Sequence, residues 1–149
     1  MMTFNREAYL QEVASEFRRD FKRLGVSLPA VHISVGHVGR GKTIGGTYQR
    51  EISADNRNHI FLDPWVSDTE MAVAVIGHEL VHAVLDCEGG HGREFQLLAR
   101  QIGFTKPYSE PWPSDRLEER IREIISRVGK YKHAQLNIYQ SPPSKCRMR

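Results

Sequence analysis

The chain has 149 residues, of which 40% are hydrophobic and 26% charged, and its formal net charge is +3. This length and balance predict one domain with a hydrophobic core and exclude a disordered chain. The longest apolar run, Met71–Leu85, is too short and too often interrupted by ionisable residues to span a membrane. Two cysteines do not make a disulfide framework, and the N-terminus lacks an apolar signal segment, so we expect a cytoplasmic location.

The positive charge is concentrated near the C-terminus. Residues 130–149 contain five bases and no acid, so residues 1–129 carry a net charge of −2. Such a segment can bind the phosphates of a nucleic acid, which would associate the protein with the nucleoid, or it can be a solvated end without fixed structure. We expect a folded domain over residues 1–137 and a basic, flexible tail over residues 138–149.

The first half of the domain reads as one helix and three short strands. Apolar residues recur at helical spacing over residues 5–24, and the opposite face mixes acids and bases, as a solvated face does. Strands are predicted at Val31–Val38, Thr43–Gln49 and His59–Leu62, and Gly45-Gly46 in the second indicates a bulge or a close backbone approach. The tight connections favour a small, mostly antiparallel sheet of three strands.

The stretch Glu70–Asp86, EMAVAVIGHELVHAVLD, is almost wholly apolar and predicts a buried helix, which a capping box at Ser67–Glu70 would begin. Between its two end acids, the only ionisable residues are His78, Glu79 and His82, which spell H-E-x-x-H. On a helix the two imidazoles lie one turn apart on the same face. Burying these groups is costly unless they are paired or bind a metal, so the motif predicts a metal site.

Two further helices are predicted after the turn at Gly89-Gly90, which we expect to end the central helix. The first runs from about Gly92 and stops at Gly103, and the second begins at Ser114 or Asp115 and fades after Gly129. Between them, three prolines forbid regular structure.

A catalytic zinc ion takes three protein ligands and one open position for water, so the motif needs a third ligand. Candidates directly downstream are Asp86, Cys87, His91 and Glu94. His91 is favoured because the Gly-Gly turn can fold the chain back over the helix end. Glu94 would instead give two histidines and one glutamate, and Cys87 reads as a small buried residue.

Such a site would hydrolyse peptide bonds. Zinc lowers the pKa of its bound water to about 7, and Glu79 could take the proton of that water and pass it to the leaving amine. A further group should stabilise the tetrahedral intermediate, and His133, Tyr131 and Tyr108 are candidates among which the sequence does not choose. The alternative is a His-Glu-His cluster whose members bond one another without a metal.

A second motif competes with the first. Gly36–Thr43, GHVGRGKT, satisfies the phosphate-binding pattern G-x-x-x-x-G-K-[ST]. That loop must begin a helix whose N-terminus faces the phosphates, whereas the residues after Thr43 include two glycines and β-forming side chains. A Gly-rich hairpin turn is therefore favoured, and nucleotide binding remains an alternative.

The stretch HELVHAVLDCEGGHGREF, residues 78–95, resembles the SprT-like family of zinc metallopeptidases, which includes the Spartan proteases acting on DNA–protein crosslinks. The family pattern is H-E-x-x-H followed by H-G-x-x-F, which here corresponds to His78, Glu79, His82, His91, Gly92 and Phe95. The resemblance implies one Zn²⁺ per chain held by the three histidines, with Glu79 as the catalytic residue. A late Tyr-x-His-Ala-x-Leu at residues 131–136 extends the resemblance to about residues 5–137.

The implied fold is α+β: a minimal zincin-like core with the N-terminal helix, the small mostly antiparallel sheet, the buried H-E-x-x-H helix and two further helices. The implied activity is endopeptidase cleavage of protein substrates, including DNA-bound ones, and the alternative is a DNA-associated or regulatory zinc-binding module with little turnover. Many members carry a C-terminal zinc ribbon of two Cys pairs, but only Cys146 stands near this C-terminus. DNA contact would then fall to the basic residues, no membrane partner is expected, and the oligomeric state stays open.

Overall fold

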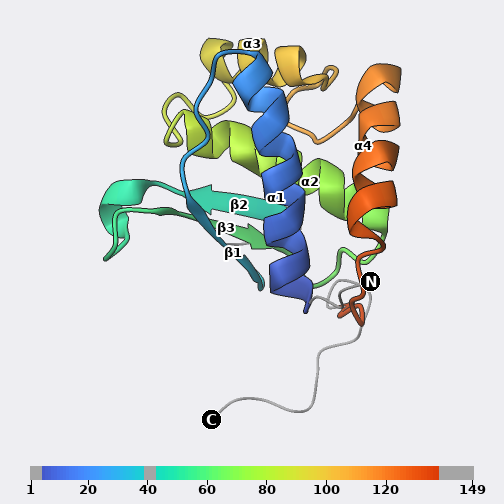
Figure 1. The fold of residues 1–149 in the computed structure, drawn as a ribbon. Helices are drawn as coiled ribbons and strands as arrows, with labels where there is room; N and C mark the ends of the chain where they lie inside the picture. Colours follow the sequence, from blue (N-terminus) through green and yellow to red (C-terminus); the bar gives the residue numbers. More distant parts are fainter. Residues whose placement is uncertain (1–4, 39–42, 138–149) are drawn as a thin grey trace.

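The computed structural model describes residues 5–38 and 43–137, and it shows the α+β fold predicted from the sequence. Figure 1 shows helix α1 crossing in front of α2 and of the sheet, with α4 beside α1 and α2 on the side away from the strands. Among the described residues, no helix is both long and apolar enough to cross a bilayer. The elements, in chain order, are α1 (Arg6–Arg23), β1 (Val31–Val35), β2 (Gly45–Tyr48), the 3-10 helix η1 (Arg50–Ile52), β3 (Asn58–Leu62), α2 (Thr69–Val84), α3 (Arg93–Ile102) and α4 (Asp115–Val128).

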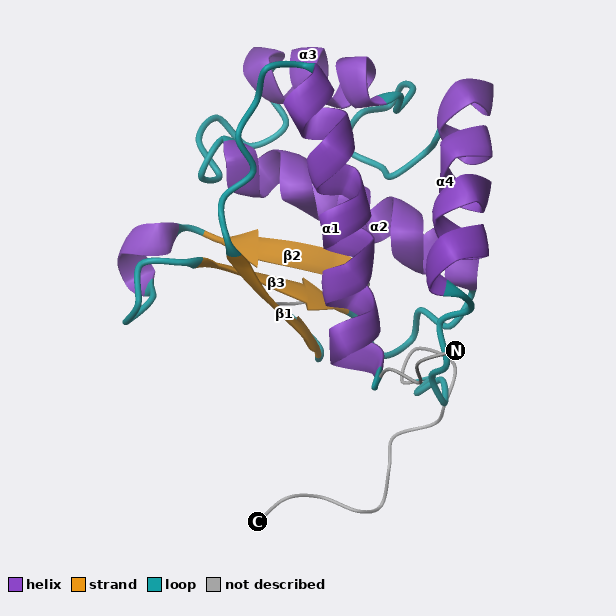
Figure 2. Ribbon diagram, in the orientation of Figure 1, coloured by secondary structure: helices purple, strands orange, loops and turns teal. Residues whose placement is uncertain are grey.

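The sheet is mixed rather than mostly antiparallel. Its strand order is β1-β3-β2, with β1 parallel to β3 and β2 antiparallel to β3, so that the arrows of β2 and β3 point in opposite directions in Figure 2. The expectation of a mostly antiparallel sheet assumed that strands neighbouring in sequence also pair. Instead β3, which buries Asn58, Ile60 and Leu62, takes the central position, where a strand is covered by neighbours on both edges.

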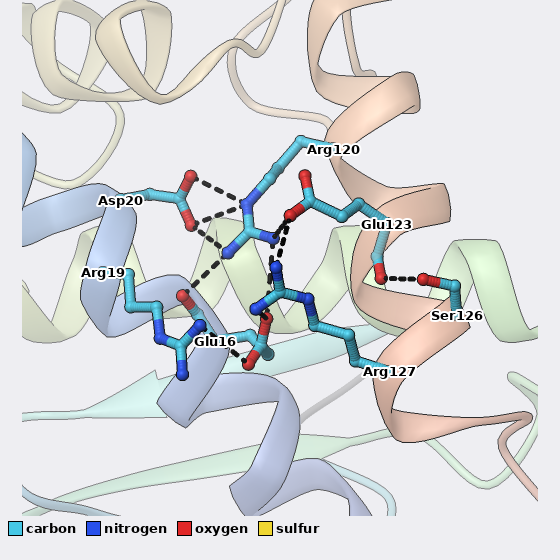
Figure 3. A network of polar contacts seen from close by, with 7 residues as sticks. All are labelled: Glu16, Arg19, Asp20, Arg120, Glu123, Ser126 and Arg127. Carbon is cyan, nitrogen blue, oxygen red and sulfur yellow. Dashed lines mark hydrogen bonds and ion pairs between the residues drawn. The ribbon is translucent and has the colours of Figure 1, made fainter.

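Helix α1 has the predicted apolar face, but its opposite face is not simply solvated. Glu16 and Asp20 point toward α4, where the guanidinium of Arg120 lies between them (Figure 3). Arg120 donates from Nε and Nη2 to the carboxylate of Asp20 at 3.0 Å each and from Nη2 to the backbone oxygen of Glu16 at 3.0 Å. Because the Arg120 side chain is only 12% exposed, this ion pair joins the two helices in a partly dry environment.

Arg120→Ala should lower the free energy of unfolding by about 3 kcal/mol, since at a buried helix contact it removes the cation that Asp20 bonds and the nearest of the three arginines around Glu16. Urea unfolding followed by circular dichroism measures the loss. Arg122→Ala is the matched control, because Arg122 is an exposed arginine of the same helix, and it should change stability by less than about 0.5 kcal/mol. Equal, small losses in both variants would show that the ion pair is as solvated as the sequence suggested.

Helix α2 is buried almost throughout, as its sequence predicted. Its cap is Asp68 rather than Ser67: the Asp68 carboxylate accepts from the backbone N of Met71 at 2.9 Å, as an N-cap residue does. Gly77 lets α1 approach closely, because a Cβ there would lie 2.8 Å from the ring of Phe17. The helix also ends earlier than predicted, at Val84, several residues before the Gly-Gly pair.

The last two helices confirm their predicted limits. Gly92 is the N-cap of α3, and Gly103 ends that helix with φ of 124°, a conformation that glycine adopts most easily. Ser114 is the N-cap of α4, where its hydroxyl accepts from the backbone N of Leu117 at 3.2 Å. The predicted tail, residues 138–149, lies outside the described part of the chain.

Candidate metal centre

Three imidazoles converge at the C-terminal half of α2. His78 and His82 come from consecutive turns of the helix, and His91 comes from the segment before α3. The Nε2 atom of His91 lies 3.0 Å from Nε2 of His82 and 3.3 Å from Nε2 of His78. A tetrahedral zinc ion with Zn–N bonds of about 2.0–2.1 Å holds its nitrogens about 3.3–3.4 Å apart. The spacing of these donors therefore fits one metal ion, and their type suits zinc, copper, iron or nickel.

The turn after α2 brings His91 back over the helix. Two non-glycine residues, Asp86 and Cys87, adopt positive φ of 51° and 63°, and Gly89 and Gly90 follow with φ of 72° and 53°. The Asp86 carboxylate accepts from the backbone N of Arg50 and from the side-chain amide of Asn58, at 2.9 Å each. These contacts stabilise a strained turn. They also occupy the Asp86 carboxylate, which therefore supports the fold and is not part of the group of histidine donors.

The other downstream candidates also lie outside the cluster. The thiol of Cys87 donates to the backbone oxygen of Thr47 at 3.4 Å, and Glu94 is exposed on the first turn of α3. Within residues 5–38 and 43–137, only His91 among the four candidates completes a group of donors with His78 and His82.

The local environment keeps the imidazoles neutral. Burial, with smaller contributions from the neighbouring imidazoles, lowers the pKa of His78 to about 3. Burial and then His91 lower the pKa of His82 to about 4, and burial also lowers the pKa of His91. The ring of Phe95 packs against all three. At neutral pH each ring therefore keeps a lone pair that a metal can use without first displacing a proton from an imidazolium.

Glu79 lies beside this cluster and is only 6% exposed. Its Oε2 is 4.0 Å from Nε2 of His78, and its Oε1 accepts a hydrogen bond from the hydroxyl of Thr47 at 2.9 Å. Burial raises the pKa of Glu79 to about 7, and the Thr47 hydroxyl opposes that rise by stabilising the charged form. Sequence reasoning missed Thr47, because its role depends on how β2 pairs and on which face of the sheet it occupies.

The Gly-Gly pair in β2 marks the close approach that the sequence predicted. A Cβ at Gly45 would lie 2.7 Å from Cγ1 of Val75 and 3.2 Å from Oε2 of Glu79. A side chain at this position would displace either the strand or the carboxylate. The absence of a side chain therefore lets β2 pass directly over Glu79.

A cleft of about 350 Å³ opens onto the cluster. Strand β2 forms one wall and residues 109–111 form the other, with Glu79 and the three imidazoles between them. Such a concave site with a few convergent polar groups can hold a small molecule or a segment of another chain.

Of the three candidates for stabilising an intermediate, only Tyr108 lies near the cluster, where it lines a hollow together with His91. The backbone N of Tyr131 donates to the hydroxyl of Thr69 at 3.1 Å, and Nε2 of His133 bonds the backbone oxygen of Pro64 at 2.7 Å. Both residues therefore lie near the start of α2, about 13 Å along the helix from His78. They support the fold at that end, away from the imidazoles.

The phosphate-loop interpretation lacks its structural context. Residues 39–42 of the motif lie outside the described part of the chain, but the structure describes Thr43 and the residues after it. Thr43 leads into strand β2 and not into a helix. No helix N-terminus directly follows the motif, so the feature that binds the phosphates in such loops is missing.

Comparison with known proteins gave one match. The model of the SprT-like family matches residues 7–123, which extend from α1 into α4 and include His78, Glu79, His82 and His91. Searches of curated proteins and of solved structures found no match.

Proposed function

The chain belongs to the SprT-like family, and from this membership we propose that it is a zinc-dependent endopeptidase. The observation that carries the proposal is the position of Glu79: a buried carboxylate beside three converging imidazoles, in a cleft that is open to substrate. The arrangement provides a metal-binding group and a proton acceptor within one site, as hydrolysis of an amide requires.

In this proposal His78, His82 and His91 hold the zinc ion, which supplies a Lewis acid and lowers the pKa of water. Glu79 accepts the proton of the attacking water and returns it to the leaving amine. A carboxyl group with a pKa near 7 can do both at neutral pH, and a nearby cation would bring that value down toward the usual range. Thr47 fixes the carboxylate through its hydrogen bond to Oε1.

The substrate peptide would lie along β2, which is an edge strand. The backbone N of Asp63 donates to the oxygen of Ile44, so these two residues form a hydrogen-bonded pair of the antiparallel strands. Such pairs alternate along the strands, so every second residue from Ile44 onward bonds β3 through its backbone. The backbone groups of Gly45 and Thr47 then point to the free edge, and the Thr47 oxygen already accepts from Cys87. Among the described residues, no other segment bonds the backbone of Gly45 at this edge, so an added strand could pair there, beside Glu79 in the cleft.

We further propose that some substrates are DNA-bound proteins. Charge supports this part of the proposal: residues 130–149 hold five bases and no acid, and Lys130 and Lys132 are exposed in the structure. Such residues could contact the phosphates while the cleft engages the protein.

Cleavage assays with and without a chelator test the function. The purified protein should cleave casein, a strong chelator should abolish cleavage, and stoichiometric Zn²⁺ should restore it. Adding DNA together with a basic DNA-binding protein as substrate tests the second part, which predicts faster cleavage with DNA at low salt than at high salt. A zinc-loaded protein that cleaves neither substrate would favour the binding module with little turnover.

Thr47→Val should shift the acidic limb of the pH–rate profile to higher pH. The base must be ionised to accept a proton, and losing the Thr47 hydroxyl removes a bond that favours the ionised form, so the pKa of Glu79 rises. The measurement is kcat/KM for a peptide substrate against pH, and Thr47→Ser should restore the original profile. An unchanged profile for Thr47→Val would show that Thr47 does not act on the base.

A further inference from the structure

The outer face of the sheet carries a second group of metal-binding side chains. His32 of β1 and His59 of β3 are directly paired across the two parallel strands. Their neighbours Ile33 and Ile60 are buried beneath the helices, whereas both histidines are only partly buried. Since side chains alternate along a strand, His32 and His59 project from the face opposite to α1 and α2.

Asp55 completes this group from the turn between η1 and β3. Its Oδ2 lies 2.5 Å from Nε2 of His32, and the rings of His32 and His59 are 4.7 Å apart between centroids. The hydroxyl of Ser53 lies 2.7 Å from Oδ1 of Asp55 and 2.9 Å from Nε2 of His59, so it links Asp55 to His59. One donor atom from each of His32, Asp55 and His59 lies within 4.8 Å of the other two.

We propose that His32, His59 and Asp55 form a second metal site, which binds a divalent transition-metal ion such as Zn²⁺. Two imidazoles and one carboxylate are an ordinary donor set for such an ion, and water or a donor from another molecule can complete the shell. Nε2 of His32 and Oδ2 of Asp55 must move from 2.5 Å to about 3.3 Å apart when a metal ion takes the place of their hydrogen bond. The Asp55 side chain, 49% exposed, has room to make this adjustment.

The surroundings suit an ion that is accessible from solvent. The three donors line a hollow of about 640 Å³, whose other walls include the aromatic rings of Tyr48 and Phe61. Ser53 is placed to orient the carboxylate, because its hydroxyl can donate to Oδ1 while Oδ2 binds the ion. A metal here would tie β1, β3 and the η1–β3 turn together.

This site is separate from the cleft that holds Glu79. Thr47 turns its side chain inward to Glu79, and the next residue, Tyr48, turns outward to the ring of Phe61. The two groups of donors therefore lie on opposite faces of one sheet. Occupancy of the outer site does not depend on whether the protein is a peptidase, and it can be measured without an activity assay.

The test counts bound zinc in the full chain. Metal-stripped protein is dialysed against buffered, micromolar free Zn²⁺, and zinc and protein are then quantified. The expected result is two ions for wild type, one for His59→Ala, one for His91→Ala and none for the double variant. His37→Ala is the matched control: His37 lines the same hollow but bonds Asp63 instead of the cluster, so this variant should keep two ions.

A second variant tests the site with a substitution that should not affect folding. Asp55 is exposed, so Asp55→Asn should leave the fold intact, as judged by circular dichroism, while it removes the anionic ligand and the second ion. The ring signals of His32 in nuclear magnetic resonance spectra should also shift with zinc in His91→Ala but not in the double variant, which lacks the His59 imidazole. The proposal is wrong if His91→Ala, in which only the outer site remains complete, binds no ion, or if His59→Ala and Asp55→Asn both bind as many ions as wild type.

Discussion

Glu79→Gln should abolish peptide-bond hydrolysis and leave zinc bound. The amide has nearly the shape of the carboxylate but cannot accept the proton of the attacking water, and a lost general base costs about 10²–10⁴-fold in rate. Zinc should remain because Glu79 lies outside the group of three imidazole donors and bonds Thr47 instead. Single-turnover cleavage of a fluorogenic peptide measures the rate, and elemental analysis measures the zinc.

The matched control is Glu94→Gln. Glu94 is the other glutamate that the sequence offered to this site, and it is exposed on α3, away from the donor group. Its variant should cleave at the wild-type rate. If Glu79→Gln cleaved as fast as wild type, some other group would have to accept the proton. If it lost both zinc and activity, Glu79 would be a ligand or a support of the metal site.

The helical part of the fold was predictable because its signals are local. The period of α1, the glycine that ends α3 and the serine that caps α4 are each recognisable within a few residues of sequence. The H-E-x-x-H spacing likewise depends only on helix geometry, so it placed His78 and His82 on one face.

Features that depend on distant pairing were not predictable in the same way. The central place of β3 depends on its pairing with β1, a strand that is separated from it in sequence by β2 and η1. Whether the side chains of Thr47 and Tyr48 point toward the helices or away from them depends on the register of β2 against β3. The prediction that this face of α1 is solvated was wrong at Glu16 and Asp20, because their partner Arg120 lies about 100 residues away in the sequence and no local pattern reveals it.

His91→Ala should make zinc binding at the inner site collapse while the helices stay folded. Two imidazoles of α2 would remain as ligands. Removing a residue that only supports a ligand lowers metal affinity about 10–100-fold. Removing one of three ligands should cost more, so we expect zinc affinity to fall about 10³-fold or more. His91 is exposed in the turn before α3, so its removal leaves no cavity in the core. Competition with a chromogenic chelator measures zinc affinity, and circular dichroism reports the fold.

The experiment is cleanest in a His59→Ala background, where the proposed outer site cannot bind zinc and obscure the result. His133→Ala is the control: His133 bonds Pro64 at the other end of α2, so its loss should leave affinity unchanged. If His91→Ala kept its affinity, the third ligand would have to come from elsewhere, and Glu94→Ala would test the glutamate that the sequence offered as a ligand. A collapse in His91→Ala alone would show that the strained turn at Asp86 and Cys87 serves to bring this one imidazole over the helix, and that the metal site is built from two separate segments of the chain.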